Sequence, residues 1–403
     1  MDHRRRHLLR SAVAAGIAAS GGMFASTISF AGADAGQRRF VFVLLRGALD
    51  GLAVVPPVGD RDYARLRGEL DLSQAAQRHR LDDLFALHPA LDFMAGLWQQ
   101  KQLAVLHAVA TPYRERSHFD GQDVLESGAV APHAAQSGWL NRALAGLPAR
   151  GAGRNAGIAL GSNVPLAMRG PTAVASWSPA TMPGLDDDTL QRIGQMYGGD
   201  QLLSQRLSEA LGAEQIAGAE AGMGGMGRAG GAAQIAQVTR AAANFLAQPD
   251  GPSVAMFDTT GWDTHANEGA DKGLLAARLA ALDGGLKSLR EGLGTTWDRT
   301  VVLIATEFGR TAAVNGTRGT DHGTGAAAFL LGGAVRGGRV LAQWPGLKPA
   351  QLYQGRDLMP TTDLRSAMKS VLRDHLQVPQ KMLDDEVFPD SAAARYLPDL
   401  VRA

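Results

Sequence analysis

The side chains of this chain that could do chemistry fall in four short stretches, and each stretch follows an apolar run. They are Asp50 in RGALDGL, Arg116, Ser117 and His118 in YRERSHFDG, Asp263 and His265 in GWDTHAN, and Glu307, Arg310, Asp321 and His322 in TEFGRTAAVNGTRGTDHGTG. Carboxylates and imidazoles without thiolates suit Zn, Mn, Mg or Ca. The chain has no cysteine, which excludes thiolate metal sites, disulfides and a cysteine nucleophile.

Asp50 and the Asp-x-His pair are the first candidates for metal ligands. Asp50 stands in a glycine-containing turn just after the first apolar run, where it is either a metal-binding carboxylate or an Asp-Gly turn residue. Asp263 and His265 share a glycine-bounded loop and can turn both side chains toward one ion. The alternative for this loop is a turn with an exposed histidine.

The Ser117-His118 pair is a candidate for the reacting group. Sequence neighbours need not face each other as a nucleophile and its base would. Ser117 could instead be activated by a metal, with Arg116 binding an anionic group of the substrate. The alternative is a serine that caps a helix whose first turn is polar.

The longest polar stretch runs from Glu307 to His322 and follows the run VVLIAT. Glu307, Asp321 and His322 are candidate ligands, and Arg310 could stabilise negative charge on a substrate. The alternative is a salt bridge between Glu307 and Arg310 that closes a strand, with Asp321 capping a turn.

The elements that must position these groups are strands buried on both faces. FVFVLL (40–45), LAVLHAVA (103–110) and VVLIAT (301–306) are apolar runs of strand length, and His107 within the second is expected to be a core histidine rather than a ligand. Helical patterns recur between such runs, which predicts a three-layer α/β sandwich with a mostly parallel central sheet. In such sheets ligands bind at the carboxyl ends of the strands, where all four stretches fall.

The remaining segments define one domain, residues 36–403, with a helical, Gly/Met-rich insertion at about 185–250. Residues 60–100 read as largely helical. Residues 137–180 read as short strand-like pieces that form pocket walls or a small subsidiary sheet.

Residues 1–35 have the pattern of an export signal rather than of a fold. The Arg5-Arg6 pair precedes two leucines and an apolar run of small residues, and small-x-small cleavage sites follow at Ala33 and Ala35. We expect a twin-arginine signal handled by the twin-arginine translocase, which leaves a periplasmic or secreted protein with no membrane span. An ordinary secretory signal or a retained anchor is the alternative. The net charge of +1 argues against nucleic acid as the main partner.

Taken together, RGALDGL, LAVLHAVATPYRERSHFDGQDVLESG, GWDTHAN, TEFGRT and GTDHGTGAAAFLLGG resemble the exported DUF1501 proteins of bacteria. That family is in turn similar in fold to the alkaline phosphatase and sulfatase superfamily. The resemblance implies that Asp50 is the first metal aspartate, that Ser117 stands at the nucleophile position, and that Asp263, His265 and His322 are ligands. The departure lies at Glu307-Phe308, where the superfamily usually has Asp-His. One ion, or a site remodelled around His118 and Asp321, is therefore expected.

The function that these expectations give is a metal-dependent hydrolase of a phosphate or sulfate ester, small-molecule or polymeric. Its nucleophile would be Ser117 or a metal-activated water, with Arg116, Arg310 and His118 assisting. The alternative is a non-catalytic exported protein that binds an envelope polymer or partner and keeps a structural metal site. A metal-free Ser/His/acid esterase is less consistent with the sequence, because no G-x-S-x-G motif occurs.

Overall fold

A computed structural model describes residues 38–148, 156–179 and 231–402, together with scattered single residues between 193 and 217. Residues 1–34 form one unit and residues 35–403 a second, and everything described below belongs to the second. The predicted signal at 1–35 and most of the predicted insertion at 185–250 lie outside the described residues. None of the helices in the described part of the chain is long and apolar enough to cross a membrane.

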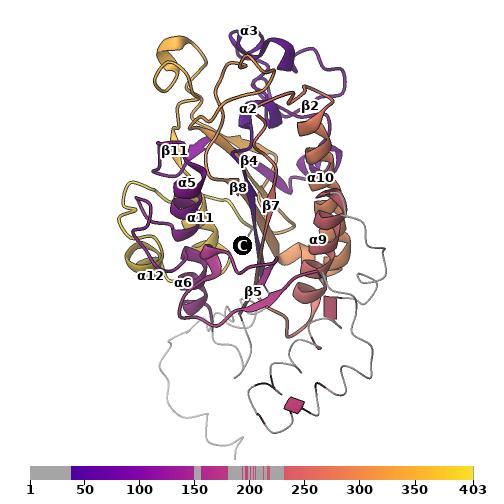
Figure 1. The fold of residues 1–403 in the computed structure, drawn as a ribbon, viewed down its shortest axis with the longest axis vertical. Helices are drawn as coiled ribbons and strands as arrows, with labels where there is room; N and C mark the ends of the chain where they lie inside the picture. The colour runs from indigo at the N-terminus through magenta and orange to yellow at the C-terminus, as the bar shows by residue number, and fades with distance from the viewer. Residues whose placement is uncertain are drawn as a thin grey trace, which may run out of the picture. The chain divides into compact units, whose positions relative to one another are not determined.

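The centre of the described chain is one large, mostly parallel sheet (Figure 1). Its strands are β1 (Arg39–Arg46), β4 (Leu103–Ala110), β5 (Gly157–Leu160), β6 (Ala175–Trp177), β7 (Val254–Thr260), β8 (Thr300–Thr306), β9 (Ala326–Leu331), β10 (Arg339–Leu341) and β11 (Thr362–Asp363). The order is β10-β4-β9-β8-β1-β7-β5-β6, with β11 also paired to β4. Only β9 runs antiparallel to its neighbours, β4 and β8.

Helices cover both faces of this sheet, as the three-layer prediction requires (Figure 1). One face carries α4 (Asp92–Gln99), α9 (Gly231–Ala247) and α10 (Leu274–Leu293). The other carries α5 (His118–Ser127), α6 (Trp139–Ala145), α11 (Leu364–Asp374) and α12 (Gln380–Met382). The α/β fold with a mostly parallel central sheet is therefore confirmed.

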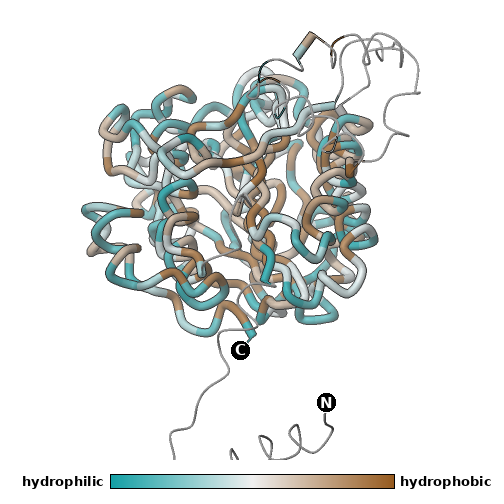
Figure 2. Tube along the Cα trace, turned by 90° about the horizontal axis from the view of Figure 1, so that it is seen from below, coloured by the Kyte–Doolittle hydropathy of each residue, from teal (hydrophilic) through white to brown (hydrophobic). Residues whose placement is uncertain are grey.

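Strand β1 shows why the strands are apolar without interruption. Val41, Val43 and Leu45 point into the core under α9 and α10, whereas the alternate residues Phe40, Phe42 and Leu44 point into the core under α6 and α11. A strand with a packed layer on each side has no polar face to present. In Figure 2, the hydrophobic segments of the chain lie mainly in the interior of the molecule.

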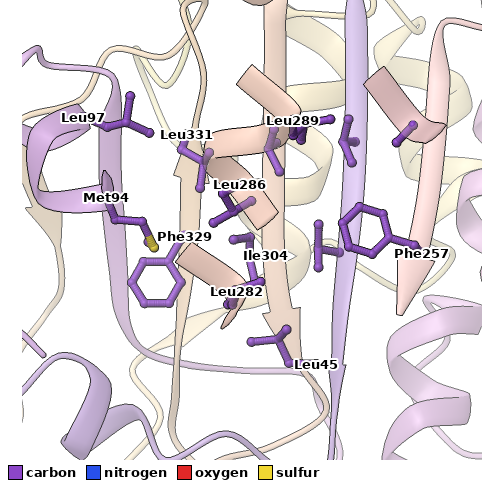
Figure 3. Close-up of a cluster of buried hydrophobic side chains, with 14 of the residues drawn as sticks. Leu45, Met94, Leu97, Phe257, Leu282, Leu286, Leu289, Ile304, Phe329 and Leu331 are labelled. Carbon is purple, nitrogen blue, oxygen red and sulfur yellow. The ribbon is translucent and has the colours of Figure 1, made fainter. Parts of the chain in front are cut away.

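The core under α10 is close-packed across three elements. Figure 3 shows Leu282, Leu286 and Leu289 of α10 reaching the strand residues Ile304 and Phe329. Each fully buried leucine contributes on the order of 1.5–3 kcal/mol. This packing holds the sheet and α10 rigid beneath the loops that follow β7 and β8.

Two sequence predictions are corrected here. Residues 60–100 contain only short helices, α3 (Tyr63–Arg67) and α4, and a small antiparallel pair, β2 (His79–Arg80) with β3 (Ala86–Leu87). The pieces at 157–160 and 175–177 extend the main sheet instead of forming a subsidiary one, because β5 pairs with β7. The alternative prediction for this region, that it forms pocket walls, is confirmed, since residues 160–166 line a cavity. Residues 166–168 form a 3₁₀ turn.

Candidate metal centre

Four side chains from three separate loops converge at one edge of the sheet. His118 is the first residue of α5, which follows β4, and Asp263 and His265 lie in the loop after β7. His322 lies in the loop between β8 and β9. Strands β7 and β8 both flank β1 in parallel, so their loops leave at the same edge. We call these four residues the His/Asp cluster.

The side chains of the His/Asp cluster point their Nε2 and carboxylate atoms at one another. Nε2 of His322 lies 2.9 Å from Nε2 of His118 and 2.9 Å from Nε2 of His265. The Asp263 Oδ1 atom lies 3.0 Å from Nε2 of His265 and 3.2 Å from Nε2 of His322, and its Oδ2 lies 3.4 Å from Nε2 of His118. His118, Asp263 and His322 alone place three ligand atoms close enough to share an ion.

The other ring nitrogen of each histidine meets an acceptor. Nδ1 of His118 lies 2.7 Å from Oε1 of Glu307, and Nδ1 of His265 lies 3.2 Å from Oδ1 of Asp321. Nδ1 of His322 lies 3.0 Å from the backbone carbonyl of Arg116. Carboxylates and carbonyls only accept, so the hydrogen of each ring is assigned to Nδ1 and each Nε2 presents a lone pair.

The Nε2 atom of His322 lies 2.9 Å from the Nε2 atoms of His118 and His265, so their lone pairs repel one another unless a cation lies between them. One proton can bridge one pair of nitrogens, whereas a metal ion satisfies all the lone pairs together. A metal-binding histidine usually donates its second N–H to a carboxylate or carbonyl, which is the pattern seen at all three rings. The donor set therefore fits a divalent metal.

The charges around the His/Asp cluster favour an ionised Asp263. Burial works against ionisation, but Arg310 and the neighbouring imidazoles outweigh it, so the pKa of Asp263 lies below its usual range. Arg310 is buried and donates to the carboxylate of Asp263 and to the carbonyls of Ala48 (2.8 Å) and Thr320 (3.0 Å). It fixes the position of Asp263.

The pKa values of two neighbouring histidines are displaced in opposite directions. The hydrogen bond to Glu307 raises the pKa of His118, although burial opposes it. Burial and the charge of His118 lower the pKa of His322. Of this pair, His118 is therefore the one that holds a proton more readily, and His322 keeps its lone pair.

Comparison with known proteins places the chain in a family. The sequence profile described as "Protein of unknown function (DUF1501)" matches residues 37–387. The chain belongs to the DUF1501 family. No curated protein matches it.

Solved structures similar to this DUF1501 chain are distant. The structure of Ps i-CgsB in complex with k-i-k-neocarrahexaose is 10% identical, with a TM-score of 0.42, over 89% of this chain and 77% of that one. The phosphonate monoester hydrolase of Agrobacterium radiobacter is 11% identical, with a TM-score of 0.37, over 85% of this chain and 74% of that one.

The structure places Glu307 and Asp321 behind the histidines and not among the ligands. Glu307 is buried, and its Oε1 also accepts from the backbone N–H of Gly47 (2.9 Å) and from Nε2 of Gln122 (3.0 Å). Burial alone would raise the pKa of Glu307, but the hydrogen bond from His118, followed by those from Gln122 and Gly47, brings it below its usual range. The pKa of Asp321 is lowered first by a hydrogen bond from Asn315 and also by His265. Both carboxylates are thus charged partners of the rings.

Asp50, predicted as the first metal aspartate, lies in a different cluster. Its Oδ1 caps α2 (Gly51–Val54) by accepting from the N–H groups of Leu52 (2.9 Å) and Ala53 (3.1 Å), and its Oδ2 pairs with the buried Arg67 at 2.5 Å. Among the described residues, it makes no contact with the three cluster histidines. As a metal ligand Asp50 is a wrong prediction, because the helix end and Arg67 occupy both oxygens.

The predicted reacting groups are also placed elsewhere. Ser117 is the N-cap of α5, and its hydroxyl accepts from the N–H of Asp120 at 3.5 Å, which is the alternative that the sequence left open. The guanidinium of Arg116 binds Asp357 (2.8 Å) and Gln354 (2.7 Å), so only its carbonyl contacts the His/Asp cluster. His118, predicted as catalytic, lies among the candidate ligands.

Sequence reasoning missed a polar network that joins the cluster to the interior. Gln122 donates to Glu307 and accepts from Arg46 at 2.7 Å, and Arg46 pairs with Glu126 (2.7 Å) and with Asp258. Burial opposes the charge on Arg46, but the two carboxylates raise its pKa overall. Gln122 and Glu126 follow His118 at helical spacings of four and eight residues, which was the available signal.

Proposed function

We propose that this DUF1501 chain is a metal-dependent hydrolase of an anionic ester, with its metal held by His118, Asp263, His265 and His322. The convergence of three Nε2 atoms and one carboxylate, each ring backed by an acceptor, is the observation that carries the proposal. Three imidazoles favour a transition metal, zinc foremost, over Mg or Ca, which prefer oxygen ligands.

The solvent exposure of the proposed ligands favours a catalytic metal site over a structural one. The side chains of Asp263 and His265 are 40% and 43% exposed, and those of His118 and His322 are 26% exposed or less. Structural metal sites are closed, whereas catalytic sites keep a position open to solvent or substrate. A divalent metal bound here would supply a Lewis acid and lower the pKa of a water molecule.

The residues around the proposed metal have separate tasks. Arg310 holds Asp263 in place, and Glu307 keeps the proton of His118 on Nδ1. Arg356 is exposed and donates to the carbonyl of His322 at 2.6 Å, so its guanidinium lies at the rim of the site. An arginine there suits a phosphate or sulfate group of the substrate, a role that the sequence gave to Arg116 and Arg310.

The experiment combines metal analysis with activity on generic esters. Purified protein is assayed for bound metal and for hydrolysis of 4-nitrophenyl phosphate and 4-nitrophenyl sulfate. His265→Ala is expected to lose metal and activity together, whereas Ser117→Ala is expected to keep both.

Two results would count against the proposal. Absence of metal binding in the wild-type protein refutes it. Metal binding without activity on any ester would favour the alternative, an exported protein that binds an envelope polymer or partner through a structural metal.

The proposal also includes export through the twin-arginine translocase to the periplasm or beyond, which rests on Arg5 and Arg6 in the predicted signal. Replacement of both arginines by lysine should keep the protein in the cytoplasm. Processing that continues unchanged would exclude this route.

A further inference from the structure

A cavity of about 900 Å³ lies beside the candidate metal centre at the carboxyl edge of the sheet, where residues of α5, α9 and α10 line it. The last residues of three parallel strands reach it: Arg46 of β1, Leu160 of β5 and Thr260 of β7. Gln122 lines the cavity and also donates to Glu307, so a single side chain separates it from the partner of His118. The volume is within the range of small-molecule sites.

The polar part of the cavity holds a network in which one arginine pairs with two carboxylates. Arg46 donates to Gln122, Glu126 and Asp258, and Glu126 also accepts from the backbone N–H of Ala167 at 3.1 Å. These contacts use Nε and Nη1 of Arg46, and no hydrogen bond of its Nη2 is seen among the described residues. Arg46 lines the cavity and therefore retains a donor that a ligand there could use.

Arg169, which also lines the cavity, donates from Nε to the carbonyl of Val164 at 2.7 Å. Arg278 of α10 is a second cation there that has no acidic partner among the described residues. Its Nη1 donates to the carbonyl of Thr260 at 3.3 Å, and its Nε is buried with no hydrogen-bond partner. Only one of its N–H groups has a partner in the described part of the chain, so the guanidinium keeps donors that a ligand in the cavity could use. The position therefore favours a negatively charged group.

Gly261 provides the space in which the Arg278 guanidinium lies. Its φ of +93° is a conformation that other residues rarely adopt, and a Cβ at this position would come within 1.9 Å of Nη1 of Arg278. The backbone after β7 is thus shaped to receive this side chain.

Apart from Arg278, the part of the cavity wall formed by α9 and α10 is largely apolar. Ile235 and Val238 of α9 and Leu274, Ala277 and Ala281 of α10 line it. Leu274 is 42% exposed, so the wall reaches the protein surface. A ligand that fills the cavity must therefore have an apolar body as well as a charged end.

We infer that this cavity binds a small organic anion with an apolar body, whose carboxylate, sulfate, sulfonate or phosphate group meets Arg278. Arg46 lies within the same cavity and can donate to a second polar group of the ligand. The inference does not depend on catalysis at the His/Asp cluster.

The test uses two fluorescent probes that share one aromatic body. 8-Anilinonaphthalene-1-sulfonate carries the anionic group, and N-phenyl-1-naphthylamine lacks it. The sulfonate should bind the wild-type protein with one-to-one stoichiometry. Arg278→Gln is expected to weaken binding of the sulfonate about tenfold or more and to leave the neutral probe unaffected.

Three further variants test whether the probes bind inside this cavity. Ala281→Trp fills the cavity and should weaken both probes, whereas Arg290→Gln, on the same helix outside the cavity, should change neither. Gly261→Ala displaces the guanidinium without removing its charge and should weaken the sulfonate, which provides a second test if Arg278→Gln fails to fold. Failure of the sulfonate to bind, or equal binding to wild type and to all cavity variants, would overturn the inference.

Discussion

Replacing Glu307 with glutamine removes the charge behind His118 while keeping the size of the side chain. In the native protein, Oε1 of Glu307 accepts from Nδ1 of His118 at 2.7 Å, a charge-assisted hydrogen bond in a buried setting. The glutamine can still accept at one atom, but it donates at the other. The imidazole becomes less basic, and its orientation is held less firmly.

The expected loss of metal affinity can be stated from this geometry. Removing a partner of a metal-binding histidine typically lowers affinity 10–100-fold, which corresponds to about 1.4–2.7 kcal/mol. Folding stability falls separately. Oε2 of Glu307 accepts from the hydroxyl of Thr306 at 2.9 Å, and an amide N–H facing a buried donor costs about 1–3 kcal/mol.

Two assays separate these effects. Competition for Zn²⁺ with a chromophoric chelator gives the metal affinity, and urea unfolding of the metal-free protein gives the stability. Asp283→Asn is the matched control, because Asp283 is also buried and accepts two backbone N–H groups, from Phe93 (2.8 Å) and Met94 (3.0 Å), in another part of the fold. It should lose stability but bind zinc as the wild type does.

The reasoning is refuted if Glu307→Gln binds zinc as tightly as the wild type. Equal losses of zinc affinity in Glu307→Gln and Asp283→Asn would also refute it, since the effect would then follow from general destabilisation. A metal-bound form stabilises the fold by mass action, so unfolding must be measured after chelation.

Three other predictions concern residues outside the cluster. Ser117→Ala should lower the free energy of unfolding by roughly 1 kcal/mol, because a helix cap is lost, and should leave zinc affinity unchanged. A loss of zinc binding in this variant would show that Ser117 contributes to the metal site. Burial lowers the pKa of both His107 and His375 to about 4 from 6.5, so the unfolded chain takes up these protons first as pH falls. Each should contribute up to about 3 kcal/mol above pH 6.5 that is lost as pH falls toward 4, and urea unfolding across that interval should show the loss. Arg67→Met leaves the buried Asp50 uncompensated and should cost about 3–5 kcal/mol in urea unfolding, and Arg67→Met with Asp50→Leu should recover part of it.

The fold could be predicted from the sequence because its central strands are buried on both faces. Such strands leave an apolar run, and β1, β4 and β8 each contain one, broken only by His107 in β4. The antiparallel direction of β9 leaves no comparable mark, because a strand between two neighbours is apolar in either direction. Residues 60–100 were harder to assign, since their polar composition suits turns and helices alike.

The candidate site could be predicted only as far as which loops carry it. The rule that ligands bind at the carboxyl ends of strands selects the loops after β4, β7 and β8, but it does not say which atoms meet. Asp50 and Ser117 each stand at a helix start, where the same side chain can cap the helix or face the site, and the structure has both as caps. Arg67, which occupies one oxygen of Asp50, comes from a segment that the sequence did not mark.

The buried cluster around Asp50 nevertheless bears on the proposed metal site through Glu268. Glu268 lies three residues after His265, and its Oε2 accepts from the hydroxyl of Thr320, two residues before His322. Burial, and next the charge of Asp50, raise the pKa of Glu268 to about 8. One fully buried group therefore ties the loop after β7 to the loop after β8. Asp50, predicted to hold the metal directly, instead lies in the buried cluster with Glu268, the residue that ties together the two loops of the His/Asp cluster.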